Sequence, residues 1–72
     1  MAEKILVVDD ERDIANLLEV YLQNENYIVY KYYCAQDAIQ CIENNEIDLA
    51  ILDIMLPDMS GFSLCQLIRE KY

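Results

Sequence analysis

Short apolar runs of strand length alternate along this chain with segments whose apolar residues recur at helical spacing. The run KILVV is continuous, which is typical of a strand buried on both faces of a parallel sheet, and a second apolar run, LAIL, ends at Asp53. We predict strands over residues 4–8, 27–32 and 49–53, and helices over residues 12–24, 35–44 and 61–71. Strands that alternate with helices indicate right-handed crossovers and an α/β fold with a parallel sheet.

The helices are predicted from apolar spacing and from the loop formers between them. The first repeats apolar residues at i, i+3, i+4, i+7 and i+8. We expect its buried face to consist of Ile14, Leu17, Leu18, Tyr21 and Leu22. The second has a narrower apolar face, made of Ala35, Ala38, Ile39 and Ile42. The third, with Leu64, Leu67 and Ile68, follows a segment typical of a loop, which contains Pro57, Asp58, Ser60 and Gly61.

The composition limits the chain to one domain and removes several classes of partner. With 72 residues it is too short for a sensor domain followed by a DNA-binding domain. Fourteen acidic residues against five basic ones give a net charge of −9, so we expect neither a nucleic-acid nor a membrane partner. The chain shows no apolar span and no signal peptide, and its three cysteines lack CxxC spacing. We therefore expect reduced thiols and a cytoplasmic location.

Acidic residues follow two of the predicted strands directly. Asp9 and Asp10 end the first apolar run, and Asp53 ends the third. The carboxyl ends of parallel strands lie along one edge of a sheet, so these carboxylates meet if the first and third strands are neighbours. Two like charges about 4 Å apart repel by roughly 4 kcal/mol at an effective dielectric near 20. A hard cation removes that cost, and Mg²⁺ prefers carboxylate oxygens. The pattern therefore predicts a Mg²⁺ site.

Asp53 is also the best candidate for a nucleophile. It ends a buried strand and precedes a loop with room for a phosphodonor, and aspartates form aspartyl-phosphates in some enzymes. A metal beside it would offset the charge of phosphoryl transfer. Two alternatives stay open at this point. Asp9 and Asp10 would also suit the N-cap of the first helix. Asp53 would also suit the end of a strand as an ordinary acidic residue with no role in binding or catalysis.

A nucleotide or flavin site is a third interpretation. LAILD resembles the strand-and-aspartate element of P-loop NTPases, but the chain contains no GxxxxGK[ST] motif. Gly61 is its only glycine, so a loop that cradles phosphate through several glycines cannot be built. This class of function is disfavoured for that reason.

The order of these motifs is similar to that of the receiver domains of two-component response regulators. The matching segments are ILVVDDE (5–11), AQDA (35–38) and DLAILDIMLPDMSG (48–61). YLQNENY and YKYY most resemble the vancomycin-resistance regulators of the winged-helix class. The resemblance covers all 72 residues. It implies a flavodoxin-like, doubly wound parallel sheet, of which this chain supplies the βαβαβα portion with strand order 2-1-3.

The resemblance implies a role for each matching residue. Asp53 is the expected phosphoacceptor for a sensor histidine kinase. Asp10 would bind Mg²⁺ directly, Asp9 largely through water, and the backbone carbonyl of Met55 would complete the protein's share of the metal ligands. Pro57 and Gly61 would shape the loop behind the site. The implied activity is that of a signalling domain and not of an enzyme, in a family whose full-length members control transcription.

The resemblance also implies a domain longer than this chain. The family has a fourth strand that ends in Ser or Thr and a fifth strand that ends in Lys. Neither strand has a counterpart in these 72 residues. We therefore expect a truncated receiver domain over residues 1–72, without a DNA-binding domain. Strand 49–53 would then be an apolar edge, which invites pairing with another chain. We predict a homo-oligomer in which another chain completes the sheet. The alternative function is a self-associating interaction fragment that takes no phosphoryl group.

Overall fold

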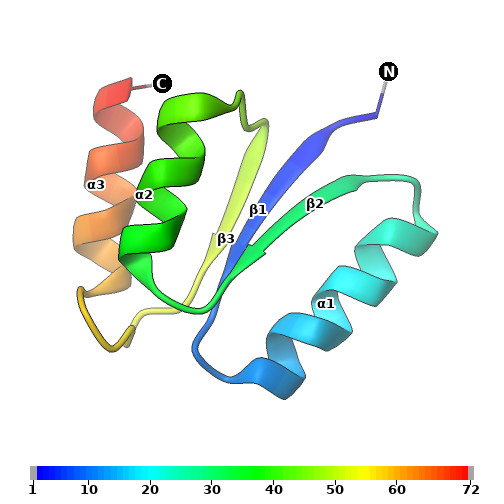
Figure 1. The fold of residues 1–72 in the computed structure, drawn as a ribbon, viewed down its shortest axis with the longest axis horizontal. Helices are drawn as coiled ribbons and strands as arrows, with labels where there is room; N and C mark the ends of the chain where they lie inside the picture. Colours follow the sequence, from blue (N-terminus) through cyan, green and yellow to red (C-terminus); the bar gives the residue numbers. More distant parts are fainter. Residues whose placement is uncertain (1, 72) are drawn as a thin grey trace.

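The computed structural model describes residues 2–71, in which strands and helices alternate as expected (Figure 1). The elements are β1 (Lys4–Val8), α1 (Arg12–Asn24), β2 (Ile28–Tyr32), α2 (Ala35–Asn44), β3 (Leu49–Leu52) and α3 (Gly61–Lys71). β2 begins one residue later than predicted and β3 ends one residue earlier, so Asp53 directly follows β3. Within the described residues, no helix is both long enough and apolar enough to cross a membrane.

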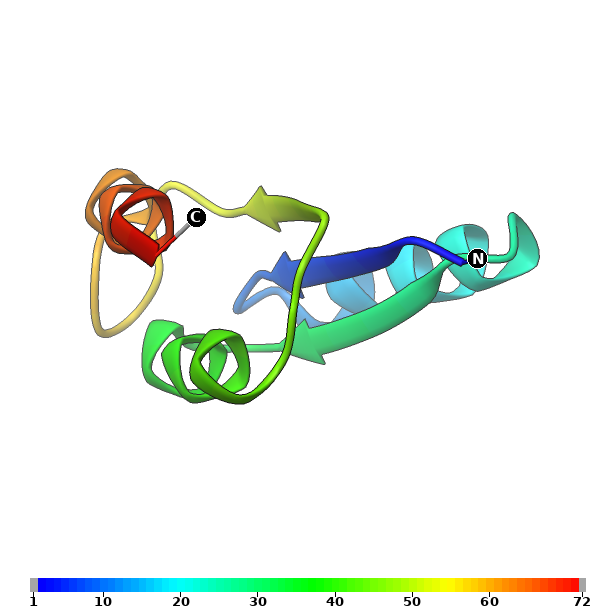
Figure 2. The ribbon, with the colours of Figure 1, turned by 90° about the horizontal axis from the view of Figure 1, so that it is seen from above.

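The sheet is parallel and its strand order is β2-β1-β3, which confirms the predicted fold class. Val8, the last residue of β1, lies opposite Tyr32 of β2 and Leu52 of β3. The three strands therefore end together at one edge of the sheet. Figure 1 shows α2 and α3 on one side of the sheet and α1 on the other, and Figure 2 shows β2 and β3 as its two outer strands.

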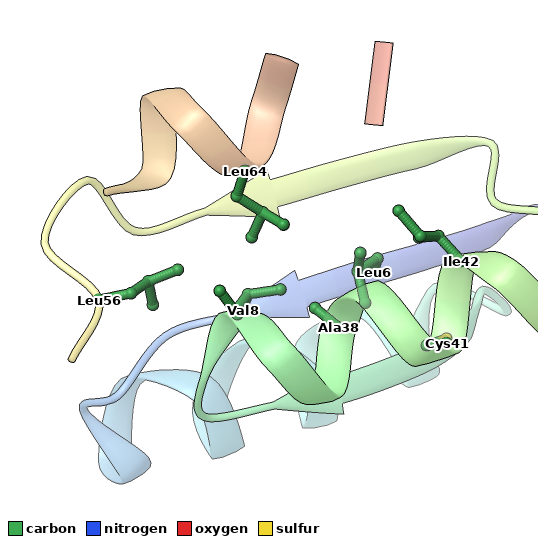
Figure 3. Close-up of a cluster of buried hydrophobic side chains, with 8 residues drawn as sticks. Leu6, Val8, Ala38, Cys41, Ile42, Leu56 and Leu64 are labelled. Carbon is green, nitrogen blue, oxygen red and sulfur yellow. The ribbon is translucent and has the colours of Figure 1, made fainter. Parts of the chain in front are cut away.

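The central strand β1 forms the core with both of its faces. Its residues from Ile5 to Val8 are all buried, as the continuous apolar run predicts. Leu6 and Val8 pack with α2, α3 and the segment that follows β3 (Figure 3). Ile5 and Val7 point to the opposite face and pack with α1. Each fully buried aliphatic side chain contributes about 1.5–3 kcal/mol to folding.

The predicted apolar face of α2 packs in the core, and so do Leu64 and Ile68 of α3, whereas the third predicted residue of α3, Leu67, is exposed. Ala35, Ala38 and Ile42 of α2 are buried, and so is Leu64 of α3. Ile39 and Ile68 pack against this cluster. Cys41 and Leu56, which the spacing did not select, are also buried in it.

The predicted buried face of α1 is wrong for three of its five residues. Ile14, Leu17 and Tyr21 are exposed, and Leu17 retains 70% of its accessible surface. Leu18 and Leu22 do pack against β1, together with the fully buried Ala15. The sheet covers only one side of α1, and the fully buried Ala15 lies on that side.

Candidate metal and phosphorylation site

Three carboxylates meet at the edge where the strands end. Asp9, Asp10 and Asp53 each offer a carboxylate oxygen, and these oxygens lie within 4.8 Å of one another. We call these residues the acidic trio. Asp9 and Asp53 are half-buried and Asp10 is exposed. The trio joins segments more than forty residues apart in the chain because β1 and β3 are hydrogen-bonded neighbours.

Hydrogen bonds beyond the strand ends hold the backbone of the trio in place. The Asp9 N–H donates to the Tyr32 carbonyl oxygen (3.1 Å), and the Asp53 N–H donates to the Val8 carbonyl oxygen (2.9 Å). Both aspartates thus continue the pairing pattern of the sheet. Their side chains consequently start from rigid backbone at the carboxyl edge, where α/β sheets bind ligands.

One oxygen of Asp9 and one of Asp53 also accept hydrogen bonds from the chain that follows them. Asp9 Oδ1 accepts the N–H of Glu11 (2.9 Å), and Asp53 Oδ1 accepts the N–H of Met55 (3.3 Å). The N-cap position of α1 belongs to Glu11, whose side chain makes no capping hydrogen bond. Asp9 and Asp10 therefore do not occupy the N-cap, and the capping alternative is not supported.

The trio consists of oxygen donors that have no cationic side chain paired with them in the described part of the chain. Within residues 2–71, no Lys or Arg side chain forms a salt bridge with any of the three carboxylates. Each pair of like charges at this spacing is unfavourable. Oxygen donors, partial exposure and clustered negative charge fit a hard cation such as Mg²⁺, which keeps several water ligands.

The loop between β3 and α3 folds back on Asp53. We refer to residues 53–60 as the 53–60 loop. A Cβ atom added to Gly61 would lie 2.0 Å from the Asp53 carbonyl oxygen, so only glycine fits there. The Gly61 N–H donates to the Ile54 carbonyl oxygen (2.7 Å), and Met55 forms an antiparallel bridge with Ser60. Gly61 therefore allows the end of the loop to close onto its beginning.

The tip of the 53–60 loop is attached to α2 through Asp58. Its carboxylate oxygens accept the backbone N–H groups of Ala35 (2.9 Å) and Gln36 (3.0 Å). These hydrogen bonds from Ala35 and Gln36 lower the pKa of Asp58. The N-cap residue of α2, Cys34, makes no side-chain capping bond of its own. Sequence analysis identified Asp58 only as a loop former, because its partners lie more than twenty residues away.

A polar cluster between α1 and β2 was also missed. Lys31 Nζ donates to Asn16 Oδ1 (2.6 Å) and to Glu19 Oε1 (2.9 Å). The hydrogen bond to Glu19 raises the pKa of Lys31. Tyr33 donates its hydroxyl proton to Asn16 (3.1 Å), and the Arg12 guanidinium lies 4.1 Å from the centre of the Tyr33 ring. The sequence signal for it is the mixture of tyrosines and Lys31 in the segment YIVYKYY (27–33).

Comparison with known proteins connects this geometry to one family. The model of the response regulator receiver domain matches residues 5–72. The regulatory protein VanR of Enterococcus faecium is 62% identical over all 72 residues, in agreement with the expected likeness to vancomycin-resistance regulators. The chain spans 31% of the length of VanR.

Solved receiver structures have the same fold. A CheY-like receiver domain protein from Methanospirillum hungatei JF-1 is 34% identical, with a TM-score of 0.96 over 99% of this chain and 57% of that one. The response regulator TrrA from Thermotoga maritima, solved in complex with Mg²⁺-BeF, is 39% identical, with a TM-score of 0.89 over 96% of this chain and 60% of that one. The chain belongs to the family of response regulator receiver domains.

Proposed function

We propose that this chain binds Mg²⁺ at the acidic trio and accepts a phosphoryl group on Asp53. The observation that supports the proposal is the approach of three carboxylates to within 4.8 Å at the carboxyl edge of a parallel sheet. The solved relative TrrA, in complex with Mg²⁺-BeF, shows that a receiver of this fold takes that ion. An ion at the trio would offset the charge that develops during phosphoryl transfer.

The spacing of the trio is compatible with a mixture of direct and water-mediated metal contacts. Two oxygens bound to one Mg²⁺ are at most about 4.2 Å apart, which is twice the usual distance of about 2.1 Å. The oxygens of the trio lie within 4.8 Å of one another, which is close to this limit. The water-mediated contact is assigned to Asp9 from the chain's likeness to the receiver family. Asp10, Asp53 and the Met55 carbonyl would hold the ion directly.

The proposed reaction is transfer of a phosphoryl group from a phosphohistidine of a sensor histidine kinase. A carboxylate oxygen of Asp53 forms the new O–P bond while the P–N bond to the imidazole breaks. The electron pair of the P–N bond stays on the imidazole nitrogen, which then takes a proton from water. The N–H of Met55 donates to Asp53 Oδ1, so that the carboxylate keeps its orientation.

The wider role of the protein is proposed from its relatives. The similar protein VanR is named a regulatory protein, and this chain spans 31% of its length. We propose that the full-length protein controls transcription in the cytoplasm, and that phosphorylation of its receiver domain is the input signal.

Self-association is a second candidate function, with its own supporting observation. Within residues 2–71, β3 pairs with β1 alone, so its outer edge has no strand beside it. Leu49, at the start of β3, retains 55% of its accessible surface. Pairing of β3 with a second copy would satisfy that edge. This alternative requires no metal and no phosphoryl transfer.

A metal titration combined with intact-mass measurement tests the proposed function. The wild-type chain is titrated with Mg²⁺ by calorimetry and then incubated with Mg²⁺ and a small acyl phosphate. We expect Mg²⁺ binding and the mass gain of one phosphoryl group. Asp53→Asn should lose the mass gain, and Asp10→Asn should weaken Mg²⁺ binding at least tenfold.

Asp37→Asn is the matched control, since it removes the same charge from an exposed position in the first turn of α2. It should keep both Mg²⁺ binding and the mass gain. A wild-type chain that binds no Mg²⁺ and gains no mass, yet self-associates, would reject the phosphoacceptor proposal and support the interaction fragment.

A further inference from the structure

Asp58 makes a helix cap that crosses from one segment of the fold to another. Its two carboxylate oxygens accept the N–H groups of the first two residues of α2, Ala35 and Gln36, at 2.9 and 3.0 Å. An N-cap side chain usually comes from the residue just before the helix. Here that residue is Cys34, which forms no such bond. We call this pair of hydrogen bonds the Asp58 cap.

The Asp58 cap holds the 53–60 loop at the end remote from β3. At its base, the loop is fixed by the contact between Gly61 and Asp53 and by the bridge between Met55 and Ser60. In its middle, Leu56 is buried in the core cluster that also contains residues of α2 and α3 (Figure 3). Asp58 itself is exposed, so its two hydrogen bonds and not burial keep it in place.

Movement of this loop would reach the acidic trio directly. The loop begins at Asp53, and the Met55 N–H donates to the Asp53 carboxylate at 3.3 Å, which is a long hydrogen bond. A shift of Met55 therefore turns the Asp53 side chain and displaces the Met55 carbonyl. Groups that orient metal ligands without touching the metal often change metal affinity by about 10- to 100-fold.

We propose that Asp58 is a positioning residue for the acidic trio, because its cap on α2 fixes the loop that carries Asp53 and Met55. The inference deepens the proposed function and rests on it where Mg²⁺ binding is concerned. Asp58 acts through Met55 and Asp53, and its carboxylate is not itself a metal ligand.

The chain offers a matched control for the loss of this cap. Asp48 Oδ2 accepts the backbone N–H of Lys4 at 2.7 Å, at the opposite end of the sheet. Asp48→Asn changes the same functional group in the same way. It leaves the 53–60 loop and the carboxyl edge of the sheet untouched.

The experiment compares Asp58→Ala, Asp58→Asn and Asp48→Asn with the wild-type chain by Mg²⁺ calorimetry and amide hydrogen exchange. We expect Asp58→Ala to raise the Mg²⁺ dissociation constant about tenfold. Asp58→Asn, which retains one acceptor oxygen, should lie in between, and Asp48→Asn should match the wild type. Asp58→Ala should also speed amide exchange at Met55 and Gly61, whereas Asp48→Asn should not.

Two results would overturn the inference. One is a dissociation constant unchanged in both Asp58 variants, since that would leave Asp58 a purely structural role. The other is unchanged amide exchange at Met55 and Gly61. If the wild-type chain binds no Mg²⁺, the proposed metal site fails, and amide exchange alone decides whether Asp58 positions the loop. If Asp58→Ala does not fold, Asp58→Asn provides both measurements.

Discussion

Gly61 and Asp58 show that single residues fix the site through backbone contacts. The backbone of Gly61 lies so close to Asp53 that no side chain fits between them. Asp58 satisfies two N–H groups at the start of α2 that would otherwise lack partners within the helix. Neither residue belongs to the acidic trio, but both determine the path of the chain immediately after Asp53.

Gly61→Ala tests the close approach of Gly61 to Asp53. Helix propensity alone predicts that alanine, at the first position of α3, stabilises the chain by up to about 1 kcal/mol. The added Cβ would lie 2.0 Å from a backbone oxygen, which cannot move without displacing β3. We therefore expect the opposite sign, a loss of about 1–3 kcal/mol in urea unfolding. Gln66→Ala, on the exposed surface of α3, is the control and should change stability little.

Asp58 should also give stability a measurable dependence on pH. Hydrogen bonds from Ala35 and Gln36 lower the pKa of Asp58 below its ordinary value of 3.8. The ionised form therefore favours the folded state. Its stabilisation is complete above the unfolded-state pKa and is lost as the pH falls through the lower folded-state pKa.

The measurement is the free energy of unfolding of wild type and Asp58→Asn across the acid range. The difference between them should be constant near neutral pH and should shrink below about pH 4. Taking the difference removes the contribution of the other acidic residues. A difference that stays constant to about pH 2 would show that the cap does not depend on charge.

At the scale of helices and strands, the sequence predicts what local chemistry determines. The continuous apolar run of β1 indicated a central strand, and acids after β1 and β3 indicated a shared edge. The orientation of α1 could not be predicted in this way. Apolar residues cover more than one face of that helix, so periodicity alone does not decide whether Leu17 or Ala15 faces the sheet.

The Asp58 cap was missed for a related reason, since no local pattern links a loop residue to a helix that begins 23 positions earlier.

A pair of leucines tests the orientation of α1. Leu22 packs on the inner face of the helix, whereas Leu17 is 70% exposed. Both Leu→Ala substitutions change helix propensity equally, so any difference between them reports packing. We expect Leu22→Ala to lower the free energy of unfolding by about 1–3 kcal/mol and Leu17→Ala to change it by less than about 0.5 kcal/mol. Equal losses in urea titrations would mean that both faces of α1 are covered in solution.

On the scale of the whole molecule, shape and charge act in opposite directions on association. The described chain is thin, with extents of 29 × 26 × 16 Å, and β3 forms one edge of its sheet. An apolar edge strand favours pairing with another copy. The net charge of −9 opposes close approach of two copies, and salt screens that repulsion. Self-association of the chain should therefore strengthen as the salt concentration rises.

Leu49→Lys tests whether β3 is the strand through which copies associate. A lysine at this exposed position of an edge strand would place two like charges side by side in a symmetric pair, and natural edge strands use lysine in this way. In sedimentation at micromolar concentration and moderate salt, we expect the wild-type chain to associate and Leu49→Lys to be monomeric. Leu17→Lys makes the same change of charge on the exposed side of α1 and should associate like the wild type. If Leu17→Lys is the variant that becomes monomeric, the contact lies on α1, and the unpaired edge of β3 is not what joins the copies.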